Sequence, residues 1–293
     1  MPELIQTLRG EGGIAFGESW SPSASSLAVA GMGGGPHVWD VTQGELRLAL
    51  AHVDLISSIS WSSDGRFLAG GSSLGEVLTF DAETGVLLHR AIGHSDEVRS
   101  VALSPDGATL ASAANDGTVV LWSAADLSPL VTIRAHNALV RSVSWAPSGK
   151  QLASGGHDAT VRVWDGTSGE TKGGLADHTA FVTTVSFSPD GLLLASASGD
   201  SSVRVWDLAE QQYRAVLTDF DQWWVEDLCF SPDGQRLATI DQNGSIRVWD
   251  TTTWSVEFLF ETYWSNKSVR WSPDGRLLAS GGTDGEQIWK VTG

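Results

Sequence analysis

The chain has 293 residues, 41% hydrophobic and 18% charged, which is too apolar for a disordered chain and too often interrupted by polar residues for a membrane protein. Eighteen Lys and Arg against 35 Asp and Glu give a formal charge of −17, which argues against nucleic acid or a membrane surface as the partner. The one cysteine, Cys229, excludes an intramolecular disulfide framework, and Met1–Leu4 opens without the basic and apolar regions of a secretory signal, so a cytoplasmic protein is expected.

A strand is expected at residues 3–9, which resemble the segment 85–89 further along the chain. Seven similar units follow it, each ending on a Trp or Phe, and these aromatic residues are spaced 40 to 43 residues apart. A fixed period of this length is typical of repeat architectures. The unit-ending residues are Trp39, Phe80, Trp122, Trp164, Trp206, Trp249 and Trp289.

Within a unit, the sequence alternates between apolar and polar residues before the final aromatic, as in residues 160–164, which predicts a half-buried strand. Earlier in the unit stands a turn such as Ser188-Pro189-Asp190-Gly191, in which Pro presets φ and Gly relieves steric strain. Helical periodicity is not sustained in any unit. Each unit is therefore predicted to form four short strands.

The units resemble WD40 repeats, which combine a Gly-His or similar dipeptide with a closing Trp-Asp about forty residues later. The resemblance covers essentially the whole chain. It implies an all-β fold, a seven-bladed β-propeller of four-stranded antiparallel blades, closed by the N-terminal strand completing the last blade. The expected single domain spans 1–293, with residues 3–9 as the outer strand of blade 7 and blades near 14–51, 54–92, 96–134, 138–176, 180–217, 223–260 and 264–291.

Three blades carry His, Ser, Asp and Trp at fixed spacing, a set that could be mistaken for a Ser-His-Asp catalytic triad. The resemblance implies a structural hydrogen-bond network instead, and its threefold recurrence also argues against catalysis. Blades 3 to 5 are expected to be stiffer than blades 1, 2, 6 and 7, in which the set has decayed. The three tetrads are His94, Ser112, Asp116 and Trp122; His136, Ser154, Asp158 and Trp164; and His178, Ser196, Asp200 and Trp206.

Ten of the 14 Trp residues occupy repeat positions, which leaves Trp223, Trp224, Trp254 and Trp264 unexplained. Three of these lie in the loops entering blades 6 and 7, which in the WD40 family line the top face around the channel. Two explanations stay open: partner binding, or repacking of blades that have lost their His, for which Trp223, Phe220 and Tyr263 are the candidates.

In the WD40 proteins that this chain resembles, the residues of each blade that line the top face around the channel often contact partners. Large aromatic residues beside a few charges are typical of interface hot spots. Arg99, Arg141 and Lys267 predict that the mouth of the channel is more basic than the acidic protein as a whole. The expected partner-binding residues are Phe16, Leu55, Arg99, Arg141, His157, Phe181, Trp223, Trp224, Glu226, Trp264 and Lys267.

Three functions remain open from the sequence. The favoured one is a non-catalytic scaffold that binds a protein or peptide on the top face, as a monomer or as a subunit of a larger complex. The second is a sensory module that holds a small ligand where His157, Arg141 and Arg99 converge. The third is a propeller enzyme, for which Glu226 and Asp227 are the one adjacent acidic pair near the mouth. No catalytic residue, metal or cofactor is expected, because neither paired Cys nor a His-Glu-x-x-His spacing is present.

Overall fold

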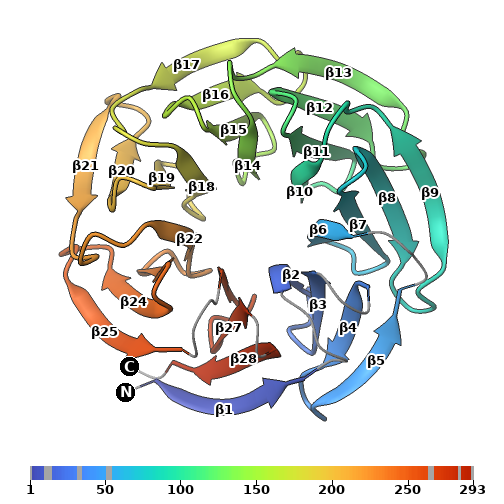
Figure 1. Cartoon of the computed structure of the whole chain (residues 1–293), viewed down its shortest axis with the longest axis horizontal. Coiled ribbons are helices and arrows are strands. Elements are labelled where there is room, and N and C mark those ends of the chain that lie inside the picture. Colours follow the sequence, from blue (N-terminus) through green and yellow to red (C-terminus); the bar gives the residue numbers. More distant parts are fainter. Residues whose placement is uncertain are drawn as a thin grey trace.

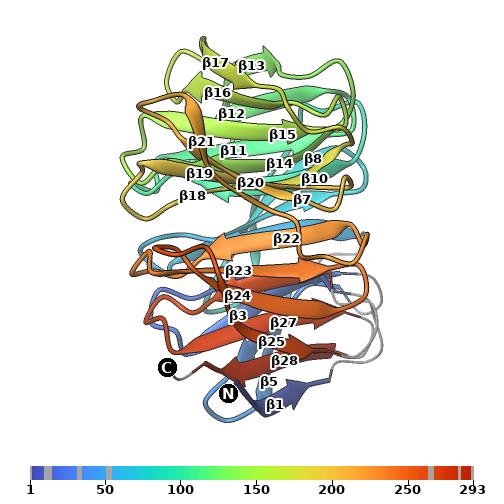
Figure 2. The same cartoon turned by 90° about the vertical axis from the view of Figure 1, so that its left-hand side faces the viewer.

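Seven four-stranded antiparallel sheets surround a central channel in the computed structural model, which describes residues 2–9, 15–31, 35–50, 55–262, 267–282 and 285–291 (Figure 1). Seen edge-on, the ring is a thick disc with the two termini side by side at its rim (Figure 2). The predicted all-β, seven-bladed arrangement is confirmed.

Each blade runs from an inner strand at the channel to an outer strand at the rim (Figure 1). Blade 1 contains β2 (Ala15–Trp20), β3 (Ser26–Gly31), β4 (His37–Asp40) and β5 (Glu45–Ala49); blade 2 contains β6 (Ile56–Trp61), β7 (Phe67–Ser72), β8 (Glu76–Asp81) and β9 (Leu87–Ile92). Blade 3 contains β10 (Val98–Leu103), β11 (Thr109–Ala114), β12 (Thr118–Ser123) and β13 (Pro129–Arg134); blade 4 contains β14 (Val140–Trp145), β15 (Gln151–Gly156), β16 (Val161–Asp165) and β17 (Thr171–Leu175). Blade 5 contains β18 (Val182–Phe187), β19 (Leu193–Ser198), β20 (Val203–Asp207) and β21 (Gln212–Leu217); blade 6 contains β22 (Val225–Phe230), β23 (Arg236–Asp241), β24 (Ser245–Asp250) and β25 (Val256–Glu261). Blade 7 contains β26 (Ser268–Trp271), β27 (Leu277–Gly282), β28 (Gly285–Lys290) and, as its outer strand, β1 (Glu3–Leu8).

Ring closure follows the prediction made for the N-terminal segment. Strand β1 pairs antiparallel with β28, from Glu3 opposite Lys290 to Leu8 opposite Glu286. Leu8 is buried in a core cluster that also contains Ile288 and Trp20. The first strand therefore covers the edge that β28 would otherwise expose, and the apolar side chain of Leu8 holds it in place.

The turn between the first two strands of a blade is held by its own side chains. In the turn at 231–234, the N–H of Gly234 donates to the carbonyl of Ser231 at 2.8 Å, and the Ser231 hydroxyl donates to Asp233 at 2.6 Å. Gly234 has a φ of +70°, a conformation that a side chain would strain. Repetition of this turn sets the first two strands of successive blades in the same antiparallel register.

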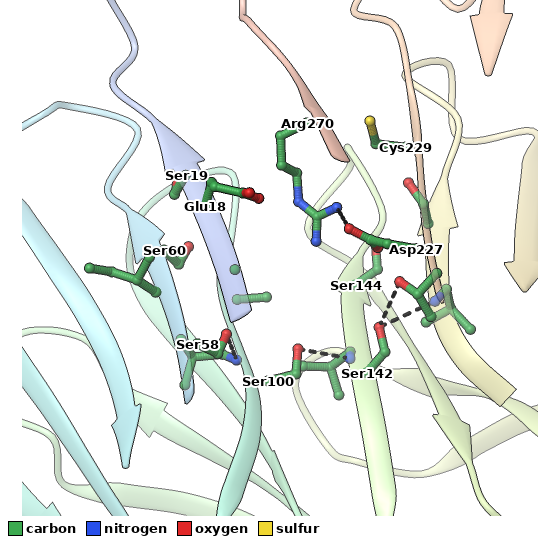
Figure 3. A pocket seen from close by; sticks show the side chains of 18 of the residues that line it. Glu18, Ser19, Ser58, Ser60, Ser100, Ser142, Ser144, Asp227, Cys229 and Arg270 are labelled. Atoms are coloured by element: carbon green, nitrogen blue, oxygen red, sulfur yellow. Dashed lines mark hydrogen bonds and ion pairs between the residues drawn. The ribbon is translucent and has the colours of Figure 1, made fainter. Parts of the chain in front are cut away.

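Neighbouring blades are joined by inner-strand hydroxyl groups that accept backbone N–H groups of the next blade. Ser58 accepts from Val101 at 3.0 Å, Ser100 from Val143 at 3.3 Å and Ser142 from Val185 at 3.2 Å (Figure 3). Ser19, Ser60 and Ser144 make the same type of bond from the second channel-facing position. These bonds satisfy N–H groups that face another sheet, as buried backbone groups require.

The inner strands enclose a channel of about 740 Å³, lined by residues from all seven blades. Within the described residues, no helix has the length and apolar character needed to cross a membrane.

Candidate functional site

In blades 1 to 6, a β-bulge in the inner strand turns one residue toward the channel mouth, and in blade 7 the equivalent residue directly precedes β26. In β10, the pairing with β11 shifts register between Val98 and Ser100, so Arg99 is the extra residue. Such an insertion re-aims a side chain. The same shift occurs in β2, β6, β14, β18 and β22. We call the residues at this position the mouth ring, all of which line the channel: Phe16, Ser57, Arg99, Arg141, Thr183, Glu226 and Lys267.

Three members of the mouth ring are linked by ion pairs. Arg141 Nη2 lies 2.9 Å from Glu226 Oε2, and Lys267 Nζ lies 3.3 Å from Glu226 Oε1. The Glu226 side chain is buried, whereas both cations are partly exposed. Because Arg141 belongs to blade 4, Glu226 to blade 6 and Lys267 to blade 7, the pairs span one side of the mouth. Both oxygens of the Glu226 carboxylate therefore accept charge-assisted hydrogen bonds.

Arg99 is held on the opposite side of the ring. Its Nε donates to Asn115 at 2.9 Å, and its Nη2 lies 3.1 Å from Glu97, which also accepts a bond from Ser57 at 2.7 Å. Each cation of the mouth ring therefore has a carboxylate beside it. Glu97 and Glu226 offset part of the charge of Arg99, Arg141 and Lys267, and a mouth more basic than the acidic whole stays a prediction.

An aromatic cluster lies beside the mouth ring on the same face. His157 stacks on Phe181 with ring centroids 4.7 Å apart, and Phe181 meets Trp224 edge to face at 5.0 Å. A Cβ at Gly199 would come within 2.6 Å of the Phe181 ring, so glycine is what allows that ring to lie over the blade 5 turn. The three aromatics come from blades 4, 5 and 6 and form one continuous surface, which we call the aromatic cluster.

The loop entering blade 6 sends its aromatic residues in two directions. Phe220 is 0% exposed and packs against Trp249, with ring centroids 5.7 Å apart. Trp223 and Trp224 remain 43% and 42% exposed, after a turn in which Asp221 and Gln222 both have positive φ. Phe220 thus repacks the blade, and the two tryptophans face solvent. Trp254 packs into the blade 6 core, and Tyr263 and Trp264 lie outside the described residues.

His157 carries little positive charge at neutral pH. Burial, followed by the nearby charges of Arg141 and Arg99, lowers the pKa of His157 below its ordinary value of 6.5. A neutral imidazole stacked on Phe181 adds an apolar surface rather than a charge to the aromatic cluster. The expected convergence of His157, Arg141 and Arg99 therefore occurs, but with the two arginines already paired.

Deeper in the channel, ionisable side chains gather on the walls of blades 6, 7 and 1. Arg270 donates to Asp227 and lies between it and Glu18 (Figure 3). The same oxygen of Asp227, Oδ2, also accepts a hydrogen bond from the N–H of Val269 at 3.0 Å. Burial raises the pKa of the Cys229 thiol to about 12, so this cysteine is an unreactive thiol at neutral pH.

The three tetrads form as predicted, on the repeat positions of blades 3, 4 and 5. In blade 4, His136 Nδ1 lies 2.8 Å from Asp158, His136 Nε2 lies 2.7 Å from Ser154 Oγ, and Trp164 Nε1 donates to the same Oγ at 2.9 Å. The corresponding Ser–His and Trp–Ser distances are 2.6 and 2.8 Å in blade 3. They are 2.8 and 3.1 Å in blade 5.

The Ser–His–Asp hydrogen-bond pattern resembles that of a catalytic triad, but each serine is buried inside its blade. Ser112, Ser154 and Ser196 are completely buried, and each hydroxyl already accepts a tryptophan N–H, so a substrate has no approach to it. Burial lowers the pKa of His136 below 6.5, against the opposing effect of Asp158. The neutral imidazole of His136 accepts a hydrogen bond from the Ser154 hydroxyl at Nε2 and donates one to Asp158 from Nδ1. Both ring nitrogens are thus satisfied, and no proton is transferred.

Blade 6 replaces the tetrad with other contacts. Trp249 Nε1 donates to Thr239 at 3.0 Å, while Arg247 pairs with Asp241 at 2.6 Å and lies over the Phe220 ring, 5.1 Å from its centroid. The arginine and its carboxylate are both buried. In blade 7, Trp289 Nε1 still donates to Ser280 at 3.1 Å. Blades 3 to 7 therefore share a tryptophan N–H that donates to a hydroxyl of the second strand.

The structure brings most of the expected partner-binding residues to one face. Arg141, Glu226 and Lys267 form the ion-paired group, and His157, Phe181 and Trp224 form the aromatic cluster. The others are Phe16 and Arg99 on the mouth ring, half-buried Leu55 before β6, exposed Trp223, and Trp264, which lies outside the described residues.

Two residues were missed by sequence reasoning, Glu18 and Glu286. Glu18 is buried at a position where the other blades carry Ile, Val or Leu, and Glu286 at one where blades 2 to 6 carry Val or Ile. Aligning the units column by column would have exposed each glutamate in an otherwise apolar column. In the described part of the chain, no group of three or more His, Cys, Asp and Glu is placed to hold a metal ion.

Comparison with known proteins agrees with this architecture. The family model "WD domain, G-beta repeat" matches residues 44–80, 85–123, 127–165, 169–207, 212–250 and 267–286, which together make up more than half of the chain. No curated protein matched the sequence. The repeat matches, the seven-bladed ring and the buried Trp–Ser–His–Asp networks together show that the chain belongs to the WD40 family.

Proposed function

We propose that this protein is a non-catalytic scaffold that holds a protein or peptide partner on the face formed by the mouth ring and the aromatic cluster. The observation that carries the proposal is the exposure of Trp223 and Trp224 beside Phe181 and His157. Exposed tryptophans on a rigid frame are frequent hot spots of binding energy, because they bury a large area and lose little conformational freedom.

The neighbouring charges suit a partner with both polar and apolar groups. The Arg141–Glu226–Lys267 group and the Arg99–Glu97 pair lie within the same face and can exchange partners with a peptide. A formal charge of −17 disfavours a phosphate backbone or an anionic membrane as the ligand. A cytoplasmic location is consistent with the single, unreactive Cys229.

The test is recovery of a partner by the purified protein from its native host, compared with the double variant Phe181→Ala/Trp224→Ala. We expect the variant to lose at least about tenfold of the recovered partner, as substitution of hot-spot aromatics does. Leu130→Ala is the matched control, since it removes an exposed apolar side chain from outer strand β13. Circular dichroism and the melting temperature should be unchanged in both variants. Unchanged recovery by a folded double variant would place the binding surface elsewhere.

The channel supports a second candidate, a small-ligand module. Its volume of about 740 Å³ and its lining of serine hydroxyls could receive a small polar molecule. A metabolite panel that raises the melting temperature of the wild type and of Phe181→Ala/Trp224→Ala alike would favour this candidate. A shift that is absent in both proteins would leave the scaffold as the better explanation.

A further inference from the structure

The contact between blades 7 and 1 differs from the other contacts between neighbouring blades. The fourth inner-strand residue is apolar elsewhere (Ile59, Val101, Val143, Val185, Leu228 and Val269) but is Glu18 in blade 1. The third-strand residue that faces it is apolar in blades 2 to 6 (Val77, Val119, Val161, Val203 and Ile246) but is Glu286 in blade 7. An apolar pair is thus replaced by two carboxyl groups at this one contact.

The two carboxyl groups lie against each other and away from water. Glu18 is 3% exposed and Glu286 is 2% exposed, and a Cβ at Gly281 would overlap oxygens of both. Ser268 donates to Glu18 Oε1 at 2.6 Å. Oxygens of both side chains lie within 2.7 Å of the place that a Cβ at Gly281 would take, so the two carboxyl groups are immediate neighbours, and burial side by side favours a proton on one of them. Glu18 Oε2 and both oxygens of Glu286 are buried without a hydrogen-bond partner among the described residues.

The charged groups around the pair do not neutralise it. Arg270 is the nearest cation and already pairs with Asp227, while the Asp227 charge itself repels Glu18. Burial, and then the Glu18 charge, raises the pKa of Glu286 well above its ordinary value of 4.5. Burial likewise raises the pKa of Glu18, although the hydrogen bond from Ser268 opposes the rise. The Cys229 thiol, whose pKa burial raises to about 12, adds no charge at neutral pH.

This contact also has a special place in the chain. At every contact between neighbouring blades the chain passes from the outer strand of one blade to the inner strand of the next, and between blades 7 and 1 the outer strand is β1. Blade 7 differs in that β1 is joined to its other three strands by strand pairing, whereas β26 is joined to blade 1 by the hydrogen bonds from Ser268 to Glu18 and from Trp20 to the carbonyl of Arg270. The ring can open here without a change in any covalent bond.

We propose that Glu18 and Glu286 form a proton-dependent latch across the contact that closes the ring. With one proton shared between them, the pair is hydrogen-bonded and blade 7 stays against blade 1. Loss of that proton to solvent leaves two buried negative charges side by side, which repel and loosen the contact. Ser268, which bonds Glu18, directly follows mouth-ring residue Lys267, so the latch lies next to the proposed binding face.

The pH dependence has a definite sign. A carboxyl group whose pKa is raised by folding binds its proton more tightly in the folded chain, so stability falls as the pH rises from about 4.5 through the folded pKa of the pair. His94 and His136 act in the opposite direction, because their pKa values are lowered by folding and their contribution is lost as the pH falls below 6.5. The effect of the latch is therefore measured as the difference in melting temperature between a variant and the wild type at each pH, because the histidines contribute equally to both proteins.

The experiment compares melting temperatures of the wild type and Glu286→Gln at about pH 5 and about pH 8. We expect Glu286→Gln to melt at least about 3 °C above the wild type at the higher pH, and the difference to shrink at the lower pH. Glu76→Gln is the matched control, since Glu76 is a buried glutamate on the third strand of blade 2 that pairs with Arg90. Its substitution should lower the melting temperature without a gain at the higher pH.

A second variant, Glu18→Val/Glu286→Val, restores the apolar pair of the other contacts and should show the same gain even if the glutamine variant does not fold. Hydrogen exchange at about pH 8 should be slower in β1, β2 and β28 of a folded variant than in the wild type. A pH-independent difference, or equal exchange in these strands, would overturn the latch. So would a melting temperature that Ca²⁺ raises in the wild type but not in Glu286→Gln, because the pair would then be a cation site.

Discussion

Ser154 shows how a reactive-looking side chain becomes a structural one. Its hydroxyl lies between Trp164 Nε1, from which it accepts, and His136 Nε2, to which it donates, and it is fully buried. The histidine is fixed in turn by Asp158. Each residue of this hydrogen-bond network satisfies the donors and acceptors of its neighbours. The network therefore stabilises the blade only when all of its residues are present.

Ser154→Ala should therefore destabilise the protein by about 2–4 kcal/mol, because it leaves both the indole N–H and the imidazole nitrogen without a partner. Denaturant unfolding followed by tryptophan fluorescence measures the loss. Ser148→Ala is the control, since Ser148 is an exposed residue of the adjoining turn and should change stability by less than about 0.5 kcal/mol. A loss of equal size in both variants would contradict a special role for the buried hydroxyl.

At the scale of strands and blades, the repeat is uniform in its backbone but not in its polar contacts. Blades 3 to 5 carry the complete tetrad. Blade 6 holds its second and third strands by Thr239–Trp249 and by the Arg247–Asp241 pair, and blade 2 has Phe80 in place of the tryptophan. Blades with fewer interstrand side-chain bonds should open more readily, since local opening breaks fewer contacts.

Hydrogen exchange of the native protein tests this difference. We expect the amides of β11, β15 and β19 to exchange more slowly than those of β3 and β7, with β23 between the two groups. Ser154→Ala serves as an internal check, because it should speed exchange in β15 more than in β11. Equal protection in all seven blades would show that stiffness is a property of the ring rather than of the tetrads.

For the molecule as a whole, the decisive contact is the one that turns a row of sheets into a ring. Strand β1 covers the edge of β28, and the neighbouring Glu18–Glu286 pair sits where blade 7 meets blade 1. A closed ring leaves each inner strand with a neighbour on both sides, which is why the mouth ring has a fixed shape. The stability of the proposed binding face therefore depends on this closure.

Leu8→Ala should weaken the closure by about 2–4 kcal/mol, because Leu8 is 2% exposed and its removal leaves a cavity beside Ile288. Leu4→Ala on the same strand is the matched control, since Leu4 is 38% exposed and should cost less than about 1 kcal/mol. Thermal melting gives the comparison, and gel filtration reports any association through the uncovered β28 edge. Equal stability of the two variants would mean that β1 does not hold the ring closed.

The sequence alone determined the seven units, their four strands, the tetrads and the closing role of residues 3–9, because these depend on local alternation, turn residues and a fixed period. The tertiary structure decided which way each loop aromatic faces: Phe220 is buried against Trp249, while Trp223 and Trp224 face solvent. It also decided the pairing of charges at the mouth, since Arg141 and Lys267 meet Glu226 only when blades 4, 6 and 7 are brought around the channel. The Glu18–Glu286 pair joins residues from opposite ends of the chain. Contacts of this kind depend on ring geometry, which no local pattern of residues encodes.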